Sequence, residues 1–159
     1  MGIVPQMIEG RRVTDEATID VVTMVYAGLL NKKVVAQLQK NSCNALGLSV
    51  ADANVIQARK RPVKTIDYGF VGDLDVSSIN VDFLKTLLEN GITPVFSAIT
   101  HDKNGLLLNT NADTIASSIA RAMAQTIETR LIFCFEKKGV LLNIEDENSF
   151  IQEINFDQY

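Results

Sequence analysis

Apolar residues along this chain follow a helical spacing and a strand-like spacing in turn. A spacing of three and four residues is typical of a helix with one apolar face, whereas short apolar runs are typical of buried strands. The helices that this pattern predicts cover residues 15–30, 31–40, 80–90 and 111–125. The strands that it predicts cover residues 45–49, 54–60, 68–76, 94–99, 106–108 and 131–135. Alternation of strands and helices favours an α/β fold, in which helices cover a sheet.

The first helix has a recognisable start and an unusual interior position. Thr14 and Asp15 can cap its N-terminus, where the helix dipole also favours a carboxylate. Gly28 predicts a bend or a close contact with another helix, since glycine inside a helix costs about 1 kcal/mol relative to alanine. The positions expected to face the core between residues 15 and 40 are Val22, Val25, Tyr26, Leu29, Val34, Val35 and Leu38.

Later elements also carry signals of where they start and end. Asn80 can cap the helix 80–90, and Gly91 can close it as the first residue beyond its end. Residues 102–105 read Asp-Lys-Asn-Gly, which is typical of a turn between two strands. Residues 131–135 read Leu-Ile-Phe-Cys-Phe and predict a strand buried on both faces.

The composition is that of a globular domain, and it argues against several classes of protein. The chain has 159 residues, of which 47% are hydrophobic and 21% charged, and this size favours a single domain over residues 1–159. A net charge of -4 argues against a nucleic-acid-binding protein, which normally carries a basic face. Residues 1–6 lack the apolar run of a signal peptide, and no apolar run approaches the roughly 20 residues of a membrane helix. We therefore expect a cytoplasmic protein without a membrane partner.

Cysteine and histidine usage predicts no metal site. Cys43 and Cys134 lie far apart and have no metal-ligand spacing. Both lie in apolar, strand-like stretches, so we expect buried, reduced thiols. His101 is the only histidine and has no ligand residues beside it, so histidine chemistry is not expected either.

Candidate chemistry begins with an arginine pair ahead of the first helix. Residues 10–15 read Gly-Arg-Arg-Val-Thr-Asp. The planar donor fork of arginine matches a carboxylate or a phosphate with two parallel hydrogen bonds. The residues alone leave a second interpretation open, in which the pair is solvated or is partnered by Glu9 and Asp15.

A second candidate site lies where a strand meets the helix 111–125. Asn109 and Asn111 are two residues apart in an extended segment, so they face the same side, and their amides can both donate and accept hydrogen bonds. The helix N-terminus beside them favours an anion. The alternative is an ordinary helix cap made by Asn111 or Asp113.

A third candidate site follows the predicted strand 131–135, where residues 136–140 read Glu-Lys-Lys-Gly-Val. The carboxyl ends of parallel strands line the ligand crevice of an open α/β sheet. The alternative is a solvated turn. The sequence contains no Gly-x-x-x-x-Gly-Lys-Ser/Thr phosphate loop, no Gly-x-Gly-x-x-Gly fingerprint and no Gly-x-Ser-x-Gly elbow.

These three places, in this order, resemble the acetylglutamate kinases of the amino-acid-kinase superfamily. The resemblance rests on Gly-Arg-Arg-Val-Thr-Asp at 10–15, Tyr-Ala-Gly-Leu-Leu-Asn-Lys at 26–32, Gly-Phe-Val-Gly-Asp at 69–73 and Leu-Asn-Thr-Asn-Ala-Asp at 108–113. It covers nearly the whole chain, and the combination of these motifs is specific where each motif alone is weak.

The resemblance implies a three-layer αβα sandwich around a mainly parallel open sheet, incomplete at both ends. It also implies transfer of the γ-phosphoryl group of ATP, with Mg, to the γ-carboxylate of N-acetyl-L-glutamate, a step of arginine biosynthesis. In that reaction Arg12 would clamp the α-carboxylate of the substrate, and Asn109 and Asn111 would also hold the substrate. Asp113 would be a catalytic residue that orients the lysines stabilising the moving phosphoryl group.

The resemblance implies a nucleotide side and a dimer as well. Glu136 and Gly139 would contact the nucleotide, in a stretch that reads Phe-Glu-Lys-Lys-Gly-Val where the family has Thr-Asp-Val-x-Gly-Val. The helix 15–30 is the expected contact surface of a homodimer.

Departures from the family pattern leave alternatives open. The family's Lys-Gly-Gly strand end and its Gly-Met-x-x-Lys segment are not found in the sequence, so we expect the 159-residue chain alone to be inactive. Residues 50–54 replace a glycine-rich segment of the family, which leaves a different acyl group, such as succinyl, open. The remaining interpretations are a non-catalytic amino-acid-binding module and a kinase acting on free aspartate or glutamate.

Overall fold

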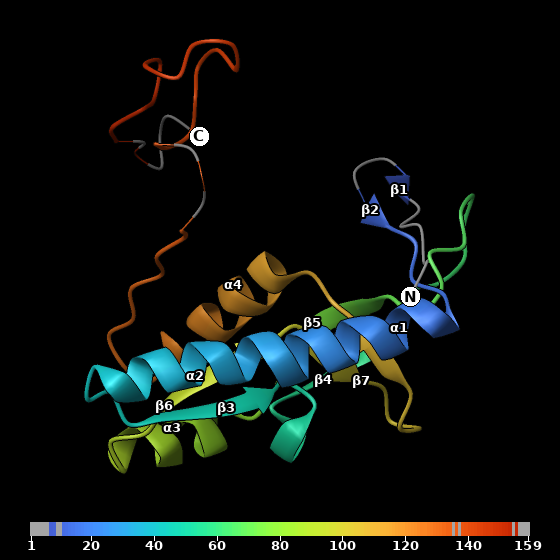
Figure 1. Cartoon of the computed structure of the whole chain (residues 1–159), viewed down its shortest axis with the longest axis horizontal. Helices are drawn as coiled ribbons and strands as arrows, with labels where there is room; N and C mark the ends of the chain where they lie inside the picture. The colour runs from blue at the N-terminus through green and yellow to red at the C-terminus, as the bar shows by residue number, and fades with distance from the viewer. Residues whose placement is uncertain (1–6, 9–10, 135, 137, 154, 156–159) are drawn as a thin grey trace.

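The computed structural model describes residues 7–8, 11–134, 136, 138–153 and 155 (Figure 1). The elements follow one another as β1 (Met7–Ile8), β2 (Arg11–Arg12), α1 (Glu16–Val22), η1 (Thr23–Leu30), α2 (Asn31–Lys40), β3 (Ala45–Ser49), η2 (Asp52–Asn54), β4 (Ile56–Lys60), β5 (Gly72–Ile79), α3 (Val81–Glu89), β6 (Thr93–Ser97), β7 (Ile99–His101), β8 (Leu107–Asn109) and α4 (Ala112–Met123). This alternation confirms the α/β class.

Local hydrogen bonds begin the helices where the sequence predicts. Asp15 caps α1, because its Oδ1 accepts the Thr18 N–H at 2.8 Å. Asn80 caps α3 in the same way, accepting the Phe83 N–H at 3.1 Å. Gly91 follows the end of α3 with a φ of 68°, a left-handed conformation that glycine adopts without strain.

The helical segments α1, η1 and α2 form one long continuous helix (Figure 1). Its middle part, η1, is a π-helix, which has a wider turn than the α-helix. Gly28 lies in this part, is exposed, and has no heavy atom within 4 Å of where a Cβ would stand. Within the described chain no second helix contacts Gly28, and this part of the long helix has π-helical geometry. Leu29 and Val34 are 54% and 48% exposed, although their spacing predicts inward positions.

Apart from the β1–β2 pair, the described strands form a two-stranded parallel sheet, β3-β6, and a four-stranded mixed sheet, β5-β4-β7-β8, which together make up the curled sheet layer of the fold. Strands β3 and β6 pair in parallel over five positions, from Ala45↔Thr93 to Ser49↔Ser97. Strand β4 lies between β5, which is antiparallel to it, and β7, which is parallel to it, and β8 pairs antiparallel with β7. The predicted strand 94–99 is split into β6 and β7, and the Ala51 N–H bonds the Ile99 carbonyl at 3.1 Å beside the split.

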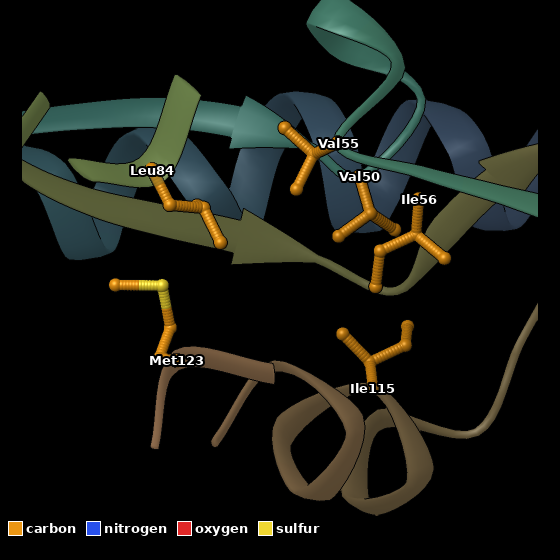
Figure 2. Packing of buried hydrophobic residues seen from close by; sticks show 6 residues of the cluster. All are labelled: Val50, Val55, Ile56, Leu84, Ile115 and Met123. Carbon is orange, nitrogen blue, oxygen red and sulfur yellow. The ribbon is translucent and has the colours of Figure 1, made fainter. Parts of the chain in front are cut away.

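Two apolar clusters lie on opposite faces of the sheet and give the molecule its layers. On one face, α3 and α4 pack over the sheet, and Figure 2 shows Ile115 and Met123 of α4 pointing toward Val50, Ile56 and Leu84. The second cluster joins the long helix to strand β7 and consists of Ile19, Val22 and Ile99, with Tyr26, Ala27 and Phe70 packed against it. Helices therefore cover both faces of the sheet, which confirms the αβα layering.

Residues Asn31 and Lys32 fasten the long helix to the parallel strand pair. The buried Asn31 side chain donates to the Val95 carbonyl at 2.7 Å and to the Leu48 carbonyl at 3.2 Å. Lys32 donates from Nζ to the Gly47 carbonyl at 2.9 Å. The Asn-Lys pair of the sequence motif therefore has a structural role. Asn31 bonds both β3 and β6, and Lys32 bonds β3.

The segment after α4 does not form the predicted strand. Residues 131–134 are exposed and irregular, and Ile132 is 73% exposed. A strand is stable only beside another strand, and this stretch runs away from the sheet (Figure 1). Neither cysteine is buried as expected, because Cys134 is exposed on this stretch and Cys43 is only half-buried after the turn that follows α2.

No helix in the part of the chain that the structure describes is long and apolar enough to cross a bilayer.

Candidate functional site

Three distant segments meet at the end of the chain's first hairpin. Strands β1 and β2 pair antiparallel, with Met7 opposite Arg12, and the chain then continues to Thr14. Thr14 is fully buried, donates its N–H to the Tyr68 carbonyl at 2.9 Å and accepts the Phe70 N–H at 2.7 Å. Because both main-chain groups of Thr14 are bonded, the strand that carries Arg12 is fixed against the segment 68–70.

Gly69 permits this close approach. Its φ of 74° lies in the left-handed region, and a Cβ at this position would lie 2.2 Å from the Thr14 carbonyl oxygen. A side chain there would push the two segments apart. The glycine that opens the Gly-Phe-Val-Gly-Asp motif is therefore required by backbone packing.

Asn109 brings the third segment to the same place. Its N–H bonds the Phe70 carbonyl at 2.8 Å, and its side chain donates from Nδ2 to Thr14 Oγ1 at 3.2 Å. The next residue, Thr110, is buried and bonds the Thr100 hydroxyl at 2.8 Å. A Cβ at Gly72 would lie 2.3 Å from Thr110 Oγ1, so the second glycine of the motif is also needed for close packing.

A cavity of about 570 Å³ opens over these three segments. This is a common size for a small-molecule site. It is lined by Arg12, Arg61, Tyr68, Val71, Gly72, Asp73, Leu74, Asn109, Thr110, Asn111 and Thr114. All three residues predicted to bind substrate, Arg12, Asn109 and Asn111, therefore line one cavity, although Asn109 lies far from Arg12 in sequence.

Asn111 has two roles at this cavity. Its Oδ1 accepts the Thr114 N–H at 2.8 Å and the Thr114 hydroxyl at 3.0 Å, so it caps α4. Only its Nδ2 donors then remain for a ligand. Asp113 is exposed in the first turn of α4 and is not among the residues that line the cavity.

The sequence interpretation missed an arginine on the other side of the cavity. Arg61 bonds Asp73 Oδ1 through Nε at 2.9 Å and through one terminal nitrogen at 2.5 Å. Its guanidinium also lies 5.7 Å from the Tyr68 ring centre, within cation–π range. Arg61 directly follows strand β4, and an arginine at the end of a predicted strand was the sequence signal that could have identified it.

A second cavity continues beyond Arg61. It has a volume of about 540 Å³, and it shares Arg61, Tyr68 and Asp73 with the first cavity. Lys64 adds a further positive charge to its wall. The two cavities together form a polar, arginine-bearing site with room beyond the predicted substrate contacts.

The predicted nucleotide residues lie elsewhere. Glu136 is exposed on the segment that follows α4, and it is not among the lining residues of either cavity. Gly139 packs near Phe150, whose Cβ would lie 3.6 Å from a Cβ on the glycine. The structure therefore does not bring these two residues to the Arg12 cavity, and their nucleotide role stays a prediction.

Hydrogen bonds shift the pKa of two carboxyls in the described residues. Donation by the side chain of Thr18, and then by its backbone N–H, holds the pKa of Asp15 below its ordinary value. The backbone N–H groups of Leu106 and Asn104 likewise lower the pKa of Asp102, which forms the predicted turn. Asp15 is therefore a charged cap immediately after the strand that presents Arg12.

No group of three or more histidine, cysteine, aspartate or glutamate side chains in the described ranges could hold a metal ion. A magnesium ion that is held mainly by phosphate oxygens needs only one or two carboxylates.

This fold and this cavity define an α/β domain with a polar site for a small molecule, lined by two arginines and two asparagines. The chain belongs to the amino acid kinase family, whose sequence profile matches residues 1–159.

Relatives give the comparison in more detail. The chain is 54% identical over 160 residues to an acetylglutamate kinase of Cytophaga hutchinsonii and 55% identical over 155 residues to one of Parabacteroides distasonis. The matches cover 100% and 98% of this chain, and the chain spans about 60% of the length of these relatives. An acetylglutamate kinase of Methanopyrus kandleri is 39% identical over 158 residues.

Solved structures agree on the fold. The crystal structure of smu.665 from Streptococcus mutans matches with a TM-score of 0.69 and 28% identity, over 77% of this chain and 48% of that one. An N-acetylglutamate synthase from Neisseria gonorrhoeae matches with a TM-score of 0.62 and 24% identity, over 77% of this chain and 27% of that one. The second likeness supports the fold alone.

Proposed function

We propose that the whole protein is an acetylglutamate kinase, which phosphorylates the γ-carboxylate of N-acetyl-L-glutamate. The observation that carries this proposal is the cavity that holds Arg12, Asn109 and Asn111 together. The relatives that share about half of the residues of this chain are named acetylglutamate kinases, which favours acetyl over the other acyl groups.

Arg12 is the anchor of the proposed substrate. Its guanidinium can donate two parallel hydrogen bonds to the α-carboxylate. Asn111 can add a donor from Nδ2, because its Oδ1 is already bonded to Thr114. Asn109 has an acceptor oxygen left over, because its hydrogen bond to Thr14 uses only an Nδ2 donor. A ligand with a carboxylate beside an N–H group fits these partners.

The phosphoryl side of the site is proposed from the family. ATP with Mg²⁺ supplies the γ-phosphoryl group, and the products are the acyl phosphate and ADP. Asp113 would orient the lysines that stabilise this group, and these lysines are not found in the 159 residues. Glu136 and Gly139 would contact the nucleotide. Because the chain spans about 60% of its relatives, these steps are proposed for the whole protein.

The long helix is the proposed surface of a homodimer. Met24, Leu29 and Leu30 on η1 are 54%, 54% and 45% exposed, and Val34 on α2 is 48% exposed. Exposed apolar side chains gathered on one helix favour a protein contact. We also propose that the protein is cytoplasmic and that residues 1–159 belong to one domain.

A hydroxamate-trapping assay tests the proposed activity. The complete protein is incubated with ATP, Mg²⁺ and hydroxylamine, which traps an acyl phosphate as a hydroxamate. The substrates compared are N-acetylglutamate, N-succinylglutamate, glutamate and aspartate. The proposal expects most hydroxamate from N-acetylglutamate and none from the 159-residue chain alone. Absence of product with every N-acylated glutamate would refute it.

A further inference from the structure

The first cavity carries charges of both signs on its wall. Among the described residues that line it, Arg12 and Arg61 are cations and Asp73 is an anion. An arginine attracts a carboxylate, whereas an aspartate attracts an ammonium group. The balance between these charges therefore decides which kind of amino-acid ligand the cavity favours.

Arg61 neutralises Asp73 at this wall. Arg61 follows β4 and Asp73 lies on the antiparallel strand β5, so one hairpin holds both residues at the same end. Nε and one terminal nitrogen of Arg61 both donate to Asp73 Oδ1, at 2.9 and 2.5 Å. The Arg61 N–H also bonds the Val71 carbonyl at 2.8 Å, which fixes its main chain beside Asp73.

This ion pair has a small effect on stability and a larger one on the cavity. The side chains of Arg61 and Asp73 are 22% and 44% exposed. An exposed ion pair contributes roughly 0–1 kcal/mol to stability. With the pair formed, the lining carries one net positive charge, whereas loss of the Arg61 charge would leave Asp73 as an unpaired carboxylate in the cavity.

The charge that an unpaired Asp73 would attract is the one that acylation removes from the ligand. Near pH 7 free glutamate carries an ammonium group beside its carboxylates, and an N-acylated glutamate carries only the carboxylates. The amino nitrogen is bonded to the carbon that bears the α-carboxylate. A ligand whose α-carboxylate is held by Arg12 therefore has its amino nitrogen in the same cavity as Asp73.

We propose that Arg61 is a specificity-determining residue, which pairs with Asp73 and thereby keeps the cavity selective for a glutamate whose amino group is acylated. This rests on the proposed function, and it adds a reason why free glutamate is rejected. Arg61 acts by removing a partner for the ammonium group, so its role does not require a contact with the ligand.

The test measures a ratio of affinities in four forms of the complete protein. Binding of N-acetyl-L-glutamate is measured by calorimetry, and binding of L-glutamate is measured by displacement of the acetylated ligand. The forms are the wild type, Arg61→Met, Asp73→Asn and the double variant. Methionine keeps an unbranched side chain without the charge, and asparagine keeps the shape of aspartate without the charge.

The preference for N-acetyl-L-glutamate should fall about ten-fold in Arg61→Met, because the freed Asp73 attracts the ammonium group of glutamate. In Asp73→Asn the preference should stay at the wild-type value or rise. In the double variant it should return to within about three-fold of the wild type, since the lining again carries one net positive charge.

The matched control removes a positive charge that has no place in the first cavity. Lys64 is exposed and lines the second cavity but not the first. Because exposed charges are screened by salt, Lys64→Met should leave the preference within about two-fold of the wild type.

Two outcomes would overturn the proposal while N-acetyl-L-glutamate still binds to the wild type. The first is an unchanged preference in Arg61→Met, which includes a general defect that weakens both ligands equally. The second is an equal fall in Arg61→Met and in the double variant, which would mean that Arg61 contacts the ligand itself. Failure of the proposed function differs from both, because the wild type would then neither bind N-acetyl-L-glutamate nor form the hydroxamate, and the role of Arg61 would fall with it.

Discussion

The side-chain amide of Asn31 donates to the carbonyl oxygen of Val95 at 2.7 Å. This bond joins Asn31, the first residue of α2, to strand β6. The same amide also donates to the Leu48 carbonyl on β3, which pairs in parallel with β6. A buried asparagine can thus replace apolar packing where a helix crosses a strand pair.

Replacement of Asn31 by alanine should destabilise the protein by about 1–3 kcal/mol, because it removes the bonds to the carbonyls of Leu48 and Val95. Urea unfolding measures the effect. The matched control is Asn41→Ala, since Asn41 is exposed at the end of the same helix. It should change the free energy of unfolding by less than about 0.5 kcal/mol. Equal effects of the two substitutions would show that Asn31 does not fasten the strands.

The loop after β3 contains a strained alanine. Ala53 has a φ of 52°, and Ala51 on the same loop has a φ of -72°. Glycine should stabilise the protein by up to about 1 kcal/mol at position 53, because it adopts a positive φ without a steric cost. The same change at position 51 should destabilise it by roughly 0.5–1 kcal/mol, because it only adds freedom to the unfolded chain. Thermal unfolding of Ala53→Gly and Ala51→Gly separates the two effects. A melting temperature for Ala53→Gly below that of the wild type would contradict the claim that Ala53 is strained.

Asp15 should make the stability of the first helix depend on acid. Its pKa is lowered in the folded state by the Thr18 hydrogen bonds, from an ordinary value of 3.8. A lowered folded pKa contributes stability at pH values above 3.8, and this contribution is lost as the pH falls through the lower folded value. Asp15→Ser keeps a capping side chain that does not titrate. The loss of stability between pH 5 and pH 2, roughly the range over which such carboxyls titrate, should therefore be smaller in Asp15→Ser than in the wild type. If stability fell equally with pH in both proteins, Asp15 would not contribute to the acid dependence of stability.

Local features were predictable from the sequence, since their partners lie within three residues. The caps at Asp15 and Asn80 each join a side chain to an N–H three positions later. Short-range bonds of this kind depend only on residue type and order. The helix starts and most strands were therefore predicted correctly.

Features that need distant partners were not predictable in the same way. The bond from Asn109 to Thr14 spans 95 positions, and the pair Arg61–Asp73 spans 12, so neither follows from spacing. The predicted strand 131–135 does not form over its described residues 131–134, because an apolar run becomes a strand only where another strand accepts its hydrogen bonds. Residue type and spacing marked Arg12, Asn109 and Asn111 as candidates, the family resemblance gave them substrate roles, and their meeting point is visible only in the structure.

The role of Arg12 is the central claim about the site, and kinetics of Arg12→Ala in the complete protein test it most directly. The control is Arg130→Ala, because Arg130 is exposed and lines neither cavity. Loss of a bidentate, charge-assisted contact should raise the KM for N-acetylglutamate about ten- to hundred-fold and leave the KM for ATP within about two-fold. Arg130→Ala should change neither. Equal increases in both KM values for Arg12→Ala, or no increase in either, would contradict the carboxylate clamp.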